Sequence, residues 1–523
     1  MAAMSRLPRI PSRPDDDACY LALKARDARF DGCFFTGVTS TGIYCRPVCR
    51  VRAPKRENCR FFSHAALAEQ QGFRPCLRCR PELAPGLPAW GLSETGRAWS
   101  IQDSSSILAL QAAQLLDTPQ AWRNCTPSVA ALAAQLGVSD RHLRRIFEAH
   151  LGVSPLQYLQ TRRLLCAKQL LTDTALPMRQ VAQLSGFSSV RRFNAVFGEH
   201  YRLQPTALRR NHGSAAVGLG LNVQLAYRPP YDVDAMLRFF ELRHIPGLEQ
   251  VCASGPLPGV QKTLRLQAGD TQHSGWVEAR FDEAHCRVKL YISDSLREVV
   301  PVVMRQVRAW LDLDADPQAI NQVLHTRFAQ GDGLRVPGTL DGFELAVRAV
   351  LGQQITVAAS RTLAVRLVQQ FGAPLQTPDA ALNRLFPSPA ALAAASLDAL
   401  GQLGIVKQRQ AAIGALAQAV VSGTLSLHPG ADLEATLKTL QALPGIGDWT
   451  AQYIAMRALR WPDAFPAGDV ALHSALGLRQ HKAPAAEAER LSQAWRPWRS
   501  YAVVRAWHAL SLPHNPLDSR TGD

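Results

Sequence analysis

The hydrophobic pattern divides the chain into regions that predict different secondary structures. Between about residues 107 and 210, apolar residues recur every three or four positions, which predicts helices. Two short segments, WVEARF at 276–281 and CRVKLYI at 286–292, alternate apolar and polar residues and therefore predict strands. From about residue 312 onward the chain is rich in Ala and Leu and is again predicted to be helical.

Two segments without such patterns separate the first helical region from its neighbours. PELAPGLPAWGLSETG, which begins at residue 81, and NHGSAAVGLGL, which begins at residue 211, have the composition of linkers. Before the first of them the chain is rich in Cys, Arg and Phe. Because 523 residues suffice for three or four domains, we predict four. Their predicted boundaries are 10–85, 104–211, 222–310 and 311–515.

Composition then narrows the class of protein. Lys and Arg number 58 against 42 Asp and Glu, so the formal net charge is +16, which favours nucleic acid over a membrane surface as partner. The 11 cysteines are odd in number and sparse, which disfavours a disulfide scaffold. The N-terminal segment lacks the apolar run of a signal peptide, and no apolar stretch reaches the length of a membrane span. We therefore predict a cytoplasmic protein with no membrane partner.

Four cysteines have the spacing of metal ligands. Cys45 and Cys49 are separated by three residues, and Cys76 and Cys79 by two, with 26 residues between the pairs. Two such pairs can close a tetrahedral site, so the sequence predicts one bound Zn²⁺ rather than redox-active or unrelated cysteines. A purely structural zinc ribbon remains open as an alternative to a reactive site.

Arginines flank these cysteines, among them Arg46 and Arg50, and guanidinium groups are well suited to hold phosphates. The strings FDGCFFTGVTSTGIYCRPVCRVRAPKRENCRFF and GFRPCLRCRPE resemble the N-terminal zinc domain of the Ada adaptive-response proteins. That resemblance implies a small α+β domain that takes a methyl group irreversibly from DNA methyl phosphotriesters. It also implies that Cys45 is the acceptor and that Cys49, Cys76 and Cys79 complete the site.

The helical region contains two segments of the form helix, glycine turn, basic helix. In VAALAAQLGVSDRHLRRIFEAHLG the turn is at Gly137 and Ser139 is the expected N-cap, whereas in MRQVAQLSGFSSVRRFNAVFGEHY they are Gly186 and Ser188. Ordinary helical hairpins share this form, but the basic second helices favour a major groove. The side chains predicted to contact DNA are Arg144, Arg191, Arg192 and Asn194.

This pair of segments resembles the all-α DNA-binding domain of AraC/XylS-type transcription activators. The resemblance implies promoter DNA as a partner and, for an activator, RNA polymerase. Ada itself ends in a methyltransferase domain built around a Pro-Cys-His-Arg motif, and this chain has no such motif.

The C-terminal half contains a tight turn and an acidic residue of interest. In LQALPGIGDWTAQYIAMRAL, Gly445 and Gly447 permit a sharp turn into a helix whose free N–H groups can hold a phosphate. In FPAGDVALHSALG, Asp469 stands just before a helix, where an aspartate is usually an N-cap.

These strings, together with YRPPYDVDAMLRFF, AVRAVLGQQIT and WRPWRSYAVVRAWHAL, resemble the AlkA-type alkylpurine DNA glycosylases of the helix-hairpin-helix superfamily. The resemblance implies a TATA-binding-protein-like α+β lobe, two all-α lobes and a catalytic role for Asp469. It implies that Gln354 fills the gap left by a flipped base, although the AlkA type has leucine there, and that the hairpin holds a monovalent cation. It also implies a base pocket formed by Phe239, Trp449, Tyr453 and Trp507, whose faces would attract a cationic purine.

The sequence thus predicts a multidomain, mainly α protein with two activities on double-stranded DNA. One is methyl acceptance from alkylated DNA coupled to activation at a promoter, and the other is excision of N-alkylated purines of the 3-methyladenine type. The alternative is a transcription regulator only, in which the glycosylase half is an inactive DNA-binding scaffold.

Overall fold

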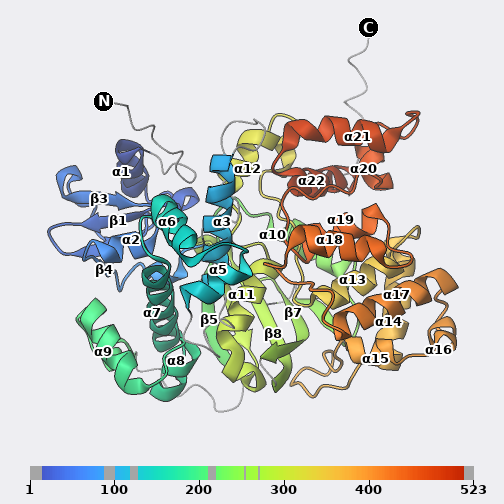
Figure 1. Cartoon of the computed structure of the whole chain (residues 1–523), viewed down its shortest axis with the longest axis horizontal. Coiled ribbons are helices and arrows are strands. Elements are labelled where there is room, and N and C mark those ends of the chain that lie inside the picture. Colours follow the sequence, from blue (N-terminus) through green and yellow to red (C-terminus); the bar gives the residue numbers. More distant parts are fainter. Residues whose placement is uncertain are drawn as a thin grey trace, which may run out of the picture.

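The computed structural model of the chain describes residues 15–86, 101–117, 128–209, 220–252, 255–268 and 271–511. In Figure 1 the N-terminal elements, in blue, and the C-terminal helices, in orange and red, lie on opposite sides of a central sheet. Both predicted linkers lie largely outside the described residues.

The N-terminal domain is a small sheet with two helices. Its elements are α1 (Asp16–Ala25), β1 (Phe35–Val38), β2 (Ile43–Cys45), β3 (Cys59–Phe62), α2 (Ala65–Gln70) and β4 (Arg74–Pro75). The strand order is β3-β1-β2-β4, with β2 and β4 parallel and the other pairs antiparallel. Because the parallel pairing sets Tyr44 beside Pro75, the cysteines that follow them, Cys45 and Cys76, leave the sheet at the same edge.

The second region is helical, as predicted. Its helices are α3 (Ile101–Leu116), α5 (Val129–Gln135), α6 (Asp140–Leu151), α7 (Pro155–Asp173), α8 (Met178–Leu184) and α9 (Val190–Tyr201). The two turns place Gly137 and Gly186 at φ +67° and +80°, a conformation that glycine adopts without steric cost. The Ser139 hydroxyl caps α6, as predicted, by accepting the N–H of His142.

The predicted cap of α9 is wrong by one residue. Ser189, rather than Ser188, has the extended backbone of an N-cap, and its hydroxyl accepts the N–H of Arg192 at 3.2 Å. Two adjacent serines cannot be distinguished by sequence, because either hydroxyl can serve as the acceptor.

The next region is the α+β lobe. Its elements are β5 (Leu221–Ala226), α10 (Val233–Glu241), β6 (Glu249–Cys252), β7 (Gly259–Ala268), β8 (Thr271–Asp282), β9 (Arg287–Ile292) and α11 (Val300–Trp310). The sheet is antiparallel throughout, in the order β5-β9-β8-β7-β6, so the two strands predicted from alternation are confirmed as parts of β8 and β9. Alternate residues Val277, Ala279 and Phe281 are fully buried, which explains the observed period of two.

Helices form the remainder of the chain. They are α12 (Pro317–Leu324), α13 (Gly342–Leu351), α14 (Val357–Phe371), α15 (Pro389–Ala393), α16 (Leu397–Gly401), α17 (Lys407–Val421), α18 (Leu433–Ala442), α19 (Asp448–Arg457), α20 (Val470–Ala475), α21 (Pro484–Ser492) and α22 (Arg499–Ser511). Two cores meet at α19. Ala451 and Ile454 pack into the core of α13, α14 and α17, whereas Ala455 and Met456 pack into the core of α20 and α22.

The hydrophobic cores also join the domains. Leu164 and Leu170 of α7 and Phe193 of α9 belong to the same buried cluster as Val223 of β5 and Leu290 of β9. The helical region is therefore packed directly on the sheet of the α+β lobe. The predicted fold class, a mainly α multidomain protein with a four-cysteine domain, is confirmed. In the described part of the chain, no helix has the length and apolarity needed to cross a membrane.

Candidate active site and metal centre

A groove of about 1730 Å³ is lined by residues of the α+β lobe and of both helical lobes. Small-molecule pockets usually measure roughly 300–1,000 Å³, so this groove can accommodate a segment of a larger ligand. Among the residues that line it are Phe239, Trp449, Tyr453, Asp469 and Trp507. The structure thus brings together the side chains that the sequence predicts for a base pocket and its reactive carboxylate.

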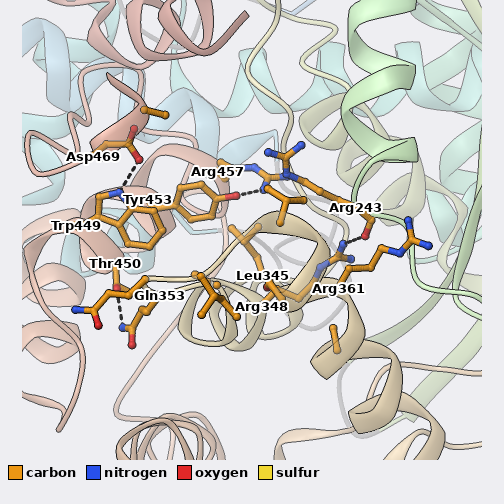
Figure 2. A pocket seen from close by; sticks show the side chains of 18 of the residues that line it. Arg243, Leu345, Arg348, Gln353, Arg361, Trp449, Thr450, Tyr453, Arg457 and Asp469 are labelled. Atoms are coloured by element: carbon orange, nitrogen blue, oxygen red, sulfur yellow. Dashed lines mark hydrogen bonds between the residues drawn. The ribbon is translucent and has the colours of Figure 1, made fainter. Parts of the chain in front are cut away.

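Three donors hold the Asp469 carboxylate. Its Oδ1 accepts the N–H of Leu472 at 2.7 Å, which caps α20, and the indole Nε1–H of Trp507 at 3.0 Å. Its Oδ2 accepts the indole Nε1–H of Trp449 at 2.9 Å, as Figure 2 shows. Asp469 is therefore an N-cap and, at the same time, a nearly buried carboxylate fixed at the groove wall, with 9% of its surface exposed.

The aromatic side chains form a continuous wall. The rings of Trp449 and Tyr453 are parallel within 16°, with centroids 5.3 Å apart, and Trp507 is tilted by 43° with its centroid 6.2 Å from that of Tyr453. At 5.3 Å two stacked rings are in direct contact. No base fits between Trp449 and Tyr453, and a base can stack only on a face that they leave free.

Two arginines that the sequence did not single out complete this wall. Figure 2 shows Arg457 extending toward the Tyr453 hydroxyl, to which its guanidinium donates a hydrogen bond. The guanidinium groups of Arg243 and Arg457 also lie 3.9 and 4.8 Å from the centroid of the Phe239 ring. Burial alone would raise the pKa of Tyr453, but the charges of Arg457 and Arg243 outweigh it and lower that pKa. The groove is therefore electrically asymmetric, with Asp469 at one end and cations at the other.

A second feature of the groove is the connection between Gln354 and the hairpin. Gln354 is exposed in the turn between α13 and α14 and has φ +55°, a conformation that is strained for a residue other than glycine. Its neighbour Gln353 donates from Nε2 to the carbonyl of Gly445 and to the hydroxyl of Thr450, both at 2.9 Å. Gly445 itself has φ +74°, and the hairpin enters α19 at Gly447, as predicted. Gln353 thus fixes the strained turn to the hairpin, a role that the sequence did not reveal.

The four predicted metal ligands form a cluster. The sulfur atoms of Cys45, Cys49, Cys76 and Cys79 lie within 4.8 Å of one another, and Cys79 is the most exposed of them. Contacts with neighbouring thiols, Cys49 foremost, raise the pKa of Cys45 far above its ordinary value, whereas contact with Cys45 lowers the pKa of Cys49 to about 7. Four thiolates can coexist at this spacing only around a cation, and a tetrahedral Zn²⁺ fits this donor set.

The arginines beside the cysteines have different surroundings. Arg50 is exposed, but Arg46 is buried and its guanidinium pairs with the carboxylate of Asp31. The predicted phosphate contact of Arg46 therefore does not agree with the structure, because its fork is already engaged inside the domain. The signal that sequence analysis missed is Asp31, fifteen residues upstream in the same FDGCFF string.

The predicted DNA-contacting residues of the helical region differ in exposure. Arg191 and Arg192 of α9 are exposed, and Arg144 of α6 is also exposed, although it pairs with Asp140 one turn earlier at 2.7 Å. Asn194 is only partly exposed. Of these four predicted contacts, Arg191 and Arg192 are the two that are exposed without an ion pair to another side chain in the described part of the chain.

Four family models match successive parts of the chain. They are the metal binding domain of Ada (residues 18–82), a helix-turn-helix domain (132–211), the AlkA N-terminal domain (222–341) and the HhH-GPD superfamily of base excision DNA repair proteins (347–499). The order is the one predicted from the sequence. The third model extends beyond the boundary predicted at residue 310.

A full-length relative has the same organisation. The chain is 38% identical over 516 residues, 96% of its length and 98% of the relative's, to the probable bifunctional transcriptional activator/DNA repair enzyme AlkA of Mycobacterium tuberculosis. The chain belongs to this AlkA family of bifunctional proteins.

Single-function relatives match parts of this AlkA-family chain. Its C-terminal part is 35% identical over 284 residues to DNA-3-methyladenine glycosylase 2 of Escherichia coli, which covers 54% of the chain and 96% of that protein. Its N-terminal part is 36% identical over 149 residues to the bifunctional transcriptional activator/DNA repair enzyme Ada of Escherichia coli, which covers 28% of the chain and 36% of that protein. The AlkA-family chain thus joins a regulatory half to a repair half, and its predicted resemblances are confirmed.

The geometry of the cluster predicts one zinc ion per chain. We expect Cys76→Ala to abolish stoichiometric zinc, measured by elemental analysis of the purified protein, and to unfold the N-terminal domain, since a structural metal contributes its binding free energy to folding. Cys59→Ala provides a matched control, because Cys59 is a buried cysteine of the same domain that lies outside the cluster. Full zinc content in Cys76→Ala would show that the four cysteines do not form the site.

Proposed function

We propose that this AlkA-family chain combines a methyl-accepting transcription activator with a DNA glycosylase that releases N-alkylated purines, such as 3-methyladenine. The domains 10–85 and 104–211 would perform the first role, and 222–310 with 311–515 the second. The observation that carries the proposal is the fixed carboxylate of Asp469 in an aromatic groove, in the same chain as a four-thiol cluster.

In the glycosylase half the damaged nucleotide must leave the duplex stack. Exposed Gln354, which has a left-handed backbone conformation at the rim of the groove, is the proposed residue that fills the gap left in the duplex. Gln353 fixes the position of Gln354 relative to the hairpin through its hydrogen bond to the carbonyl of Gly445. The N–H groups at the start of α19, next to Gly445 and Gly447, are the proposed contacts to the DNA backbone. Hairpin carbonyls are the proposed ligands of a monovalent cation.

Asp469 is the proposed catalytic group. An N-alkylated purine is cationic and leaves as a neutral base, so the C–N bond breaks without prior protonation and the positive charge moves to the sugar. A carboxylate fixed by three donors stabilises this developing charge without reorganising, and water then adds to the sugar carbon and releases one proton to solvent.

The asymmetry of the groove supports the same reaction. Arg457 and Arg243 disfavour positive charge on a base that stacks near Tyr453, whereas Asp469 favours positive charge at the sugar. The arginines and Asp469 therefore both favour the movement of positive charge from the base to the sugar as the C–N bond breaks. The free energy needed to place a cationic base there would come from contacts along the DNA backbone.

In the regulatory half Cys45 is the proposed methyl acceptor. Its sulfur attacks the methyl carbon of a phosphotriester, the S–C bond forms as the C–O bond breaks, and the phosphodiester leaves as an anion. Zinc bound by the four cysteines would keep their sulfurs ionised. The sulfur of Cys79 accepts the main-chain N–H of Arg46 at 3.3 Å, which reduces its nucleophilicity.

Methylation of Cys45 removes one negative charge from the cluster. At about 10 Å from a phosphate, one unit of charge is worth about 0.4 kcal/mol in water and about 1.7 kcal/mol at an effective dielectric constant near 20. Summed over several phosphates, this change raises affinity for promoter DNA, to which Arg191 and Arg192 are the proposed contacts. RNA polymerase is the proposed partner of the activated state.

Asp469→Asn tests the excision activity. Asparagine also caps helices, so the fold should persist, but the loss of the charge should lower the single-turnover rate of methylpurine release by at least about a hundredfold. Asp432→Asn is the matched control, because Asp432 caps α18 in the same way at 2.7 Å from the N–H of Ala435. If the two variants release methylpurine equally fast, Asp469 is only a cap, and the regulator-only alternative gains support.

Trp507→Phe separates the two contributions of an indole. The variant keeps an aromatic face but removes the Nε1–H that holds Oδ1 of Asp469. A hydrogen bond to a charged group contributes about 1.5–3 kcal/mol, so we expect roughly a tenfold or greater loss in single-turnover rate with little change in binding of damaged DNA. Trp498→Phe, in the nearby core, serves as the control. If Trp507→Phe releases methylpurine at the wild-type rate, the hydrogen bond from Trp507 to Asp469 does not contribute to the reaction and only the aromatic face matters.

The position of the transferred methyl group tests the regulatory half. After incubation with DNA that carries methyl phosphotriesters, peptide mass spectrometry should find S-methylcysteine at Cys45 in one equivalent per chain. The more exposed Cys79 should remain unmodified, because its sulfur accepts the N–H of Arg46 at 3.3 Å. Methylation of Cys79 instead would show that exposure, rather than hydrogen bonding, selects the acceptor.

A further inference from the structure

The residues that directly follow two of the cluster cysteines are buried arginines that point toward other parts of the chain. Arg46 follows Cys45, donates to the carbonyl of Cys79 at 3.0 Å and pairs with the carboxylate of Asp31. Arg80 follows Cys79 and donates to Asp173 at the end of α7 at 2.6 Å. Each arginine therefore ties the cluster to a carboxylate outside it.

Asp31 connects the cluster to the glycosylase half. Its main-chain carbonyl accepts a hydrogen bond at 2.7 Å from Nε of Arg228, which follows strand β5. Arg228 is fully buried and also donates to the carbonyls of Gly86, Asp314 and Ala315. One guanidinium thus joins the cysteine domain, the start of the first linker and the glycosylase half.

Asp173 forms a second connection. While its Oδ1 accepts from Arg80, its Oδ2 accepts the main-chain N–H of Gln224 on β5 at 3.2 Å. The carbonyl of Gln224 accepts from Gln169 of α7 at 2.8 Å. In the part of the chain that the structure describes, β5 lies at the edge of its sheet and pairs with β9, so these two contacts satisfy the N–H and C=O of Gln224 that face away from β9.

The contact between the cysteine domain and Arg228 has no space for a side chain at Gly32, the residue between Asp31 and Cys33. A Cβ atom there would lie 2.3 Å from the carbonyl oxygen of Pro85 and 3.0 Å from the guanidinium of Arg228. Its φ of +76° also favours glycine. The backbone of the cysteine domain is therefore in close contact with the Arg228 side chain.

We propose that the cysteine domain docks on the glycosylase lobe through Arg228 and Asp173, and that this dock is maintained only while the four cysteines are held together. Loss of the cluster would release Arg46 and Arg80, and Asp173 would lose the guanidinium that holds its carboxylate in place beside the N–H of Gln224. This inference rests on metal binding in the proposed function but on neither of the two DNA activities. If it holds, loss of metal from the cluster changes the protection of backbone amides in β5, which belongs to the repair half of the chain.

Hydrogen exchange of the full-length protein tests the proposal. The amide of Gln224 is the most direct probe, because its N–H points to Asp173 rather than into the sheet. Stripping zinc with a chelator should raise its exchange rate at least about tenfold, with residues 342–351 of α13 unchanged as an internal reference. If chelation raises exchange only within residues 16–86 and leaves β5 protected, the domains are independent and the proposal is wrong.

Matched variants separate docking from metal loss. Arg80→Gln should raise Gln224 exchange about as much as chelation does while zinc content stays at one per chain, and chelation should then have little further effect. Arg78→Gln, at an exposed arginine on the other side of Cys79, should leave Gln224 exchange unchanged. Equal exchange in the two variants would overturn the bridge through Asp173.

The bridge through Arg228 has its own pair of variants. Arg228→Gln should raise exchange both in β5 and around Asp31, whereas Lys289→Gln, on the adjacent strand opposite Gln224, should not. Because Arg228 also bonds to carbonyls of its own half, Gly32→Ala provides a test from the other side of the interface. Exchange in β5 that is unaffected by Gly32→Ala, in a variant that still binds zinc, would contradict docking at this surface.

Discussion

Four thiols that lie within 4.8 Å of one another can ionise together only around a cation, and much of the N-terminal half is arranged to satisfy this constraint. The parallel pairing of β2 with β4 brings Cys45 and Cys76 to one edge, and a tight turn after each strand returns Cys49 and Cys79. The arginines that follow Cys45 and Cys79 then extend outward to carboxylates. The same short segments therefore build the cluster and connect it to the remainder of the chain.

In the glycosylase half, one carboxylate has both a structural and a proposed chemical role. Asp469 caps α20, and a cap needs only one of its two oxygen atoms. The indoles of Trp449 and Trp507 occupy both oxygens without adding charge, so the carboxylate is fixed yet not neutralised by a cation. Each indole offers its N–H edge to Asp469 while its ring lines the groove. The aromatic wall and the carboxylate therefore depend on each other, because a substitution of either indole also alters the hydrogen bonds that hold Asp469.

The sequence predicted those features that depend on local spacing. The cysteine pairs, the turns at Gly137 and Gly186, the cap at Ser139 and the alternation in β8 each follow from contacts within a few residues. The choice between Ser188 and Ser189 depends on a single backbone torsion, which composition does not encode.

Features that depend on distant partners were not predictable in the same way. Arg46 has the composition of a phosphate contact, and only the folded position of Asp31 shows that its guanidinium is already engaged. Arg80 meets Asp173 across 93 residues, and Arg228 meets Asp31 across 197. The orientation of an indole N–H also depends on tertiary packing. For that reason Trp449 and Trp507 were predicted to contribute aromatic faces to the pocket, and their hydrogen bonds to Asp469 were not predicted.

The distribution of the excess positive charge follows from these pairings. Arg46 with Asp31 forms a buried pair of zero net charge, and Arg80 and Lys168 with Glu82 and Asp173 form a buried group of zero net charge, so the excess charge of +16 lies elsewhere. Part of it lies on exposed residues such as Arg191 and Arg192, where phosphates can reach it. Another part lies inside, since Arg457 is held by the carbonyls of Pro337 and Gly338 and by the Tyr453 hydroxyl, with no carboxylate among these partners. Under the proposed function, surface cations attract the DNA while an internal cation opposes the charge on the damaged base. Binding along the DNA backbone therefore offsets the repulsion between the cationic base and Arg457, and this repulsion is relieved only when the glycosidic bond breaks.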